Sequence, residues 1–190
     1  MRRGFKTWCE NISVRYRKDL GLSNTDPLGA KEFAQHLKIP LIKPDDISSL
    51  SPKSKRILLH EDASAWSALT LCCNGKHLII YNSSNAPQRQ SSDIMHELSH
   101  IIIGHTEQKV IHSKDLNVLI RGFNKDQEEE ADWLSGTLLL PKDALMKIKF
   151  QKISYQMALS EYCVSQSMLT MRLNRTGVNY IHKRANNKWK

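Results

Sequence analysis

Residues 91–105 read SSDIMHELSHIIIGH, and the expected architecture follows from them. Four of its apolar residues recur at the spacing of one helix face: Ile94, Leu98, Ile101 and Ile102. We expect this helix to start with a cap at Ser91 or Ser92 and to end at Gly104. The apolar spacing around its polar residues implies that the helix is largely buried.

The same helix carries an HExxH pattern, from His96 to His100. Residues four apart on an α-helix are separated by about 40° around its axis, so both imidazoles point to one side and can share a metal ion. Glu97 lies about 100° away, where its carboxylate reaches a water beside the metal and can act as a general base. This pattern is typical of zinc peptidases, and it predicts His96 and His100 as zinc ligands and Glu97 as the catalytic base.

A catalytic zinc ion needs three protein ligands and one open position, so another ligand must come from elsewhere in the chain. The metzincin pattern HExxHxxGxxH is excluded, because it needs glycine and histidine where this chain has Ile103 and Thr106. Residues 128–132, EEEAD, offer a carboxylate instead. We therefore look for the third ligand in this acidic run.

The acidic run opens a second predicted helix. Asn124 is its expected cap, with Gln127 three residues later, and the helix should run to Leu140 because Pro141 ends it. Its small or apolar face consists of Ala131, Leu134, Ser135, Leu138 and Leu139. This face should point toward the core.

Helical geometry separates the glutamates of this run. Glu128 lies about 60° from the centre of the apolar face, Glu130 about 100° and Glu129 about 160°. Glu128 is therefore the predicted third zinc ligand. Asp132, on the same side, is predicted to accept a hydrogen bond from the outer nitrogen of a metal-bound histidine. The alternative is that these acidic residues only complement the dipole of the helix.

The remaining segments predict a mixed α and β structure. Residues 26–37 have helical spacing, and residues 66–81 read as two strands joined by a tight turn at Asn74 and Gly75. Helical segments continue to about Arg175. We expect an α+β fold in which a small twisted sheet packs against the HExxH helix and further helices.

Length and composition favour one domain over residues 1–190. The chain is 40% hydrophobic and 25% charged, which suffices for one core. No apolar run approaches the about 18 residues needed to cross a bilayer, so no membrane association is expected. No apolar stretch follows Arg2 and Arg3, and the four cysteines lack CxxC spacing, so a cytoplasmic location is expected.

The net charge of +9 permits attraction to nucleic acid. The basic residues gather toward both ends of the chain, and residues 1–20 and 178–190 are predicted to be basic terminal segments. A solvated tail is the plainer interpretation, and a weak nucleic-acid contact is the alternative. The residues concerned are Arg2, Arg3, Lys6, Arg15, Arg17, Lys18, Arg172, Arg175, Lys183, Arg184, Lys188 and Lys190.

Most of the chain resembles the ImmA/IrrE metallopeptidases, which are zincin-like proteins associated with phage and mobile-element regulation. The resemblance lies in DPLGAKEFAQHLKIPLI, GKHLIIYN, SSDIMHELSHIIIGH and EEEADWLSGTLLLP. It implies one zinc ion per chain, held by His96, His100 and Glu128 in the gluzincin manner, with Glu97 as the base. Ser99 departs from the family, which often has glycine or alanine there.

The resemblance also implies a substrate. Family members are implicated in cleaving helix-turn-helix repressors, so the chain is expected to be a zinc endopeptidase that relieves repression. The oxyanion of such a reaction needs a further donor, for which Tyr81, His105, His112, Tyr155 and Tyr162 are chemically able. For His105 and His112 we favour a loop or packing role.

Two other interpretations remain. Residues 158–175 have the pattern of a helix-turn-helix, with Arg172 and Arg175 beside it, and predict a regulator that binds DNA or a partner without peptidase activity. Against it, Met168, Leu169 and Leu173 read better as core. The third interpretation is a non-catalytic fold with structural zinc or none, against which Glu97 argues because a structural site needs no base.

Overall fold

The computed structural model describes most of the chain: residues 1–105, 109–113, 116–120 and 123–187. Its packing divides the chain into two compact units. The first combines Met1–Gly29 with Trp133–Lys190, and the second is Ala30–Asp132. The α+β class is confirmed. The extent of a single domain over residues 1–190 stays a prediction.

The second unit contains a five-stranded sheet in the order β1-β3-β2-β5-β4. Strand β1 is parallel to β3, and the other neighbouring strands are antiparallel. The strands are β1 (Leu41–Ile42), β2 (Ala68–Cys73), β3 (Lys76–Tyr81), β4 (Lys109–Ser113) and β5 (Leu116–Ile120).

The predicted hairpin is confirmed in strands β2 and β3, where Ala68 pairs with Tyr81. Asn74 and Gly75, which join the strands, have φ angles of 52° and 74°. A tight turn with positive φ at both central residues matches the twist of its strands, and Asn-Gly adopts it at little cost. This turn fixes the register of the strands.

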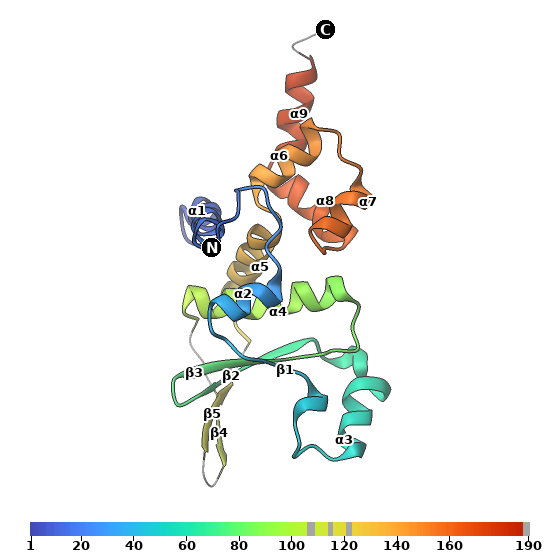
Figure 1. Ribbon diagram of the computed structural model, residues 1–190. Helices are drawn as coiled ribbons and strands as arrows, with labels where there is room; N and C mark the ends of the chain where they lie inside the picture. The colour runs from blue at the N-terminus through green and yellow to red at the C-terminus, as the bar shows by residue number, and fades with distance from the viewer. Residues whose placement is uncertain (106–108, 114–115, 121–122, 188–190) are drawn as a thin grey trace. The chain divides into compact units, whose positions relative to one another are not determined.

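Helices cover the sheet of the second unit. Figure 1 shows α2 and α4 on the same side of the sheet, and α4 packs on β2 and β3. The helical elements are α2 (Ala30–His36), a 3-10 turn (Pro44–Asp46), α3 (Pro52–Arg56), a π-helical turn (Ile57–Glu61), a second 3-10 turn (Ala63–Ala65) and α4 (Pro87–Ile103). Helix α2 falls within the predicted range of 26–37 but starts later, at Ala30.

Helix α4 carries the HExxH pattern, and its predicted cap is wrong. The helix begins at Pro87, so Ser91 and Ser92 lie inside it. Proline suits this position, because its fixed φ fits a helix and its missing N–H would have no helical partner there. The predicted end is confirmed: Gly104 follows the helix with a left-handed φ of 77°.

Helix α5 (Lys125–Leu139) begins in the second unit and ends in the first. Its predicted cap is confirmed, because Asn124 Oδ1 accepts hydrogen bonds from the backbone N–H of Asp126 and Gln127. This cap sets the start of the helix that carries Glu128.

The first unit is helical over the residues that the structure describes. Helix α6 contacts α9, and α8 contacts both α7 and α9. The helices are α1 (Phe5–Asp19), α6 (Lys142–Phe150), α7 (Tyr155–Glu161), α8 (Gln166–Arg175) and α9 (Val178–Asn187). Throughout the described residues, each helix is too short or too polar to pass through a lipid bilayer.

Arg17 and Arg172 are buried, so the interpretation of the basic ends as solvated tails is wrong for both. Arg17 donates to the carbonyl of Leu138 at 2.7 Å, and Arg172 to the carbonyl of Leu140 at 3.0 Å. Carbonyls at the end of a helix have no partner inside it, and the two guanidinium groups donate to carbonyls at and just after the end of α5. Burial lowers the pKa of Arg17 to about 10.

Candidate metal centre

The structure brings His96, His100 and Glu128 together in the second unit. The Nε2 atoms of the two histidines lie 3.0 Å apart. Glu128 Oε2 lies 3.1 Å from His96 Nε2, and its Oε1 lies 3.6 Å from His100 Nε2. These residues form the group of potential metal ligands found in the described part of the chain.

The three donors fit a metal ion. Zinc–ligand bonds of 2.0–2.1 Å in a tetrahedron place neighbouring donor atoms about 3.3 Å apart, close to the spacings observed. A carboxylate and the unprotonated nitrogens of two imidazoles repel one another at this distance unless a cation lies among them. Three ligands also leave a fourth position open, as in catalytic zinc sites.

Asp132 lies beside the outer nitrogen of His96, where the sequence predicted it. Its Oδ1 is 3.0 Å from His96 Nδ1, and its side chain remains 62% exposed. Burial lowers the pKa of His96, but the hydrogen bond from Asp132 and the charges of Glu97, Asp132 and Glu128 outweigh burial, so the pKa is raised. The carboxylates around His96 therefore favour a positive charge on its ring.

A residue on the sheet, which the sequence analysis did not identify, binds Glu97. Its side chain is buried, and Thr70 Oγ1 on β2 donates a hydrogen bond to Glu97 Oε2 at 2.5 Å. Thr70 lies in a strand whose other residues are apolar, and no sequence pattern links it to the HExxH helix. Its role follows from the packing of α4 on β2.

His105 lies in the loop after α4 with its ring against that of His100, in agreement with the loop or packing role favoured from the sequence. Its Nδ1 lies 2.7 Å from His100 Nδ1, and its Nε2 lies 3.4 Å from Glu130 Oε2. Both ring nitrogens therefore face protein groups, which argues against a role as an oxyanion donor. The sequence also assigned no role to Glu130, because helical geometry placed it about 100° from the centre of the apolar face.

Among the other oxyanion candidates, the structure describes the side chains of Tyr81, Tyr155 and Tyr162. Tyr81 is buried with the Lys31 Nζ 5.2 Å from its ring centroid. Tyr155 and Tyr162 belong to the first unit, where Tyr162 donates to a backbone carbonyl. The side chain of His112 lies outside the described residues.

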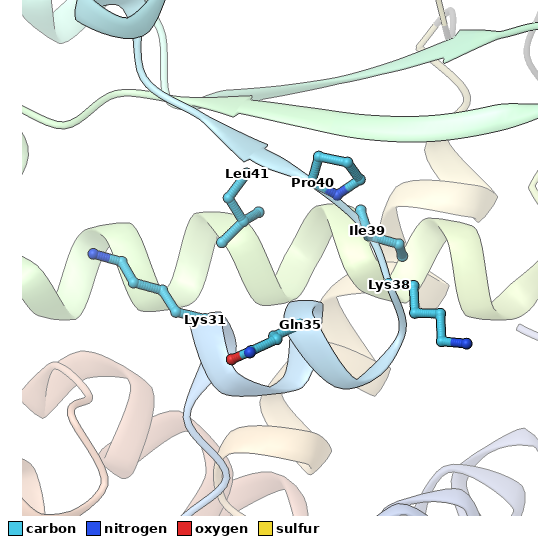
Figure 2. A pocket seen from close by; sticks show the side chains of 6 residues that line it. All are labelled: Lys31, Gln35, Lys38, Ile39, Pro40 and Leu41. Carbon is cyan, nitrogen blue, oxygen red and sulfur yellow. The ribbon is translucent and has the colours of Figure 1, made fainter.

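A shallow hollow of about 380 Å³ lies elsewhere in the second unit. Figure 2 shows its lining residues on α2 and on the segment that leads into β1: Lys31, Gln35, Lys38, Ile39, Pro40 and Leu41. Lys31 is already engaged, since it donates to Gln90. None of the candidate metal ligands lines this hollow.

The predicted helix-turn-helix segment forms α7 and α8 in the first unit. Cys163 in the turn has a left-handed φ of 48°, and the Ser165 hydroxyl caps α8. Leu169 and Leu173 are buried, as the core interpretation predicted. Arg172 is buried and bound to Glu10 and to a backbone carbonyl, so it does not offer its charge for the weak nucleic-acid contact considered above.

Comparison with solved structures gives a weak likeness. A solved structure described as a Mycobacterium tuberculosis transcriptional regulator is 11% identical, with a TM-score of 0.45. The alignment covers 90% of this chain and 47% of that one, so the chain spans about half the length of that structure. Searching curated proteins gives no significant match.

A family model matches a continuous part of the chain that contains most of the elements described above. It covers β2, β3, the HExxH helix and the glutamate helix. A peptidase family with a compact His/His/Glu group supports a metallopeptidase. The model is Peptidase_M78, the IrrE N-terminal-like domain, which matches residues 48–174, and the chain therefore belongs to this family.

Proposed function

We propose that the protein is a zinc-dependent endopeptidase in which His96, His100 and Glu128 hold one zinc ion and Glu97 is the catalytic base. The observation that carries the proposal is the convergence of three side chains from two helices, whose nearest nitrogen and oxygen atoms lie 3.0 to 3.6 Å apart. Two imidazoles and one carboxylate are the ligand set of the thermolysin type of zinc peptidase.

A zinc ion held by His96, His100 and Glu128 would act as a Lewis acid and would lower the pKa of a bound water toward about 7. Glu97 takes a proton from that water and passes it to the amine that leaves when the peptide bond breaks. The Thr70 hydroxyl holds one carboxylate oxygen of Glu97, so its orientation is set before substrate arrives. Asp132 orients His96 from the outer nitrogen.

The proposed substrate is a helix-turn-helix transcriptional repressor, whose cleavage relieves repression. Family membership supports this substrate class, and a phage or mobile-element setting follows from the same resemblance. We place the activity in the cytoplasm, because the four cysteines show neither CxxC spacing nor the density of a disulfide framework. A repressor encoded beside this chain is the first substrate to test.

Glu97→Gln tests the catalytic proposal. Purified protein is incubated with the neighbouring repressor, and cleavage is followed by mass spectrometry while metal content is measured on the same samples. The variant should retain about one zinc per chain and lose cleavage by about 10²–10⁴-fold, because the amide cannot accept the proton. Equal cleavage by both proteins would remove Glu97 from the reaction.

DNA binding through α8 is a second candidate, favoured by the distribution of charge. The first unit contains 16 Lys and Arg against 5 Asp and Glu, whereas the second contains 12 against 14. Gln166 and Ser167 at the start of α8 are exposed, and the start of a recognition helix is where side chains read bases. This surface permits DNA contact beside peptidase activity.

Titration with duplex DNA at increasing salt separates the two contributions of this candidate. A loss of affinity on double alanine substitution of Gln166 and Ser167, at physiological salt, supports base reading. If binding is lost at high salt and is unchanged by these substitutions, it reflects only attraction between phosphates and a basic protein.

A further inference from the structure

The two proposed histidine ligands are supported in different ways on their outer sides. The outer nitrogen of His96 faces the exposed carboxylate of Asp132 directly. The outer nitrogen of His100 faces a second imidazole, that of His105, and only then a carboxylate, that of Glu130. This second arrangement is buried: the exposed fractions of the His100, His105 and Glu130 side chains are 1%, 6% and 12%.

Local backbone geometry places His105 against His100. The N–H groups of Gly104 and His105 both donate to the carbonyl of His100, at 3.1 Å each. The left-handed φ of Gly104 reverses the chain after α4, so His105 returns toward the helix it has just left. The two rings meet edge to face, with centroids 4.8 Å apart.

The hydrogen bonds permit one consistent arrangement of protons when His100 binds metal. His100 directs Nε2 at the cluster, so that nitrogen offers its lone pair and Nδ1 carries the hydrogen. His100 Nδ1–H then donates to His105 Nδ1, which leaves the His105 hydrogen on Nε2, pointing at Glu130. Glu130 thereby fixes the tautomer of His105, and His105 fixes that of His100.

We propose that His105 and Glu130 are positioning residues that set the ring orientation and tautomer of His100 for metal binding. The inference rests on the proposed function, since it takes His100 as a ligand. A packing role alone does not account for the pair, because a buried imidazole and carboxylate cost free energy that an apolar pair of the same size would avoid. Outer partners of ligating histidines typically change metal affinity by 10–100-fold.

Zinc affinity of four purified variants, measured by competition with a chromophoric chelator, tests this role. His105→Phe keeps an aromatic ring but has no acceptor, and it should weaken zinc binding by about 10–100-fold. Glu130→Leu should act in the same direction. His105→Asn keeps an acceptor oxygen and should bind more tightly than His105→Phe. Exposed Glu129→Gln is the matched control and should equal the unaltered protein.

Cobalt(II) absorption and unfolding of the metal-free proteins separate positioning from folding. The visible spectrum of bound cobalt should change in His105→Phe and be restored in His105→Asn, while the unfolding midpoint without metal distinguishes a general loss of stability. Unchanged affinity and spectrum in both His105→Phe and Glu130→Leu overturn the proposal. If His105→Phe does not fold, Glu130→Leu decides by the same criteria. An unaltered protein that binds no zinc refutes the proposed function itself.

Discussion

The hydroxyl of Thr70 lies 2.5 Å from the carboxylate of Glu97 and joins strand β2 to the HExxH helix. Both residues are buried, with exposed fractions of 5% and 7%. A buried carboxylate needs donors, and a hydroxyl on a sheet holds it more firmly than one on a loop. The position of the proposed base is therefore set by the sheet as well as by its own helix.

Thr70→Val should lower kcat by about 10-fold with little change in KM, because a misplaced base transfers protons less well while substrate contacts remain. Valine keeps the shape of threonine and removes only the donor. Thr70→Ser restores the hydroxyl and should recover most of the rate. Steady-state kinetics on a repressor peptide measure both, and a rate for Thr70→Val equal to that of the unaltered protein would contradict the positioning role.

Glu128→Ala should abolish the stabilisation that zinc gives, whereas Glu129→Ala should not. A ligand that binds only the folded state at 100 times its Kd adds about 2.7 kcal/mol to the free energy of unfolding. Thermal unfolding with and without zinc measures this difference. Glu129 is the neighbouring exposed glutamate, so it controls for loss of negative charge on the same helix. Equal zinc responses in the two variants would exclude Glu128 as a ligand.

Arg172→Met should destabilise the fold by about 3–5 kcal/mol, the usual cost of removing one partner of a buried charged pair. The substitution leaves the Leu140 carbonyl without its donor and removes an ion pair to Glu10. Arg175→Met, on the exposed side of the same helix, is the control and should change stability by less than about 1 kcal/mol. Urea unfolding compares the two, and similar midpoints would refute the structural role of Arg172.

Alkaline pH should destabilise the protein through Tyr162. Burial raises the pKa of Tyr162 to about 12 from 10.0, and its hydroxyl donates to the carbonyl of Thr25. Below pH 10 the phenol is neutral in both states and its contribution is fully present. Between pH 10 and 12 the unfolded chain loses the proton first, so the free energy of unfolding should fall by up to about 2–3 kcal/mol.

Tyr162→Phe isolates this effect, because all other titrating groups are shared with the unaltered protein. The unfolding free energy of the variant should fall less steeply across the same pH range. Urea titrations at intervals from pH 9 to pH 12 provide the comparison. Parallel curves for the two proteins would show that Tyr162 titrates alike in the folded and unfolded states.

The sequence predicted those features of the fold that depend only on interactions between neighbouring residues. The Asn74-Gly75 turn, the Asn124 cap and the end of α4 at Gly104 each depend on a few adjacent residues, and the structure has all three. Helical angles also indicated which glutamate faces the two histidines. They orient a side chain relative to its own helix, and they placed Glu128 nearest the apolar face.

Three partners of the site, unlike Asp132, could not be predicted in the same way. Thr70, His105 and Glu130 act through contacts between separate elements or across a chain reversal, and the spacing of residues along the sequence does not encode such contacts. The start of α4 was missed for a different reason. A serine cap and a proline start are both good local solutions, and the chain used the earlier one at Pro87.

Arg17 shows that conserving charge is not the same as conserving chemistry. Its guanidinium donates from three different nitrogens, to the Asp26 carbonyl, the Ser13 hydroxyl and the Leu138 carbonyl. A lysine would bring the same charge on a single atom at the end of a stem, which cannot span acceptors spread over a planar fork. Variation that exchanges these two basic amino acids is therefore disruptive at position 17, although it is harmless over much of a protein's exterior.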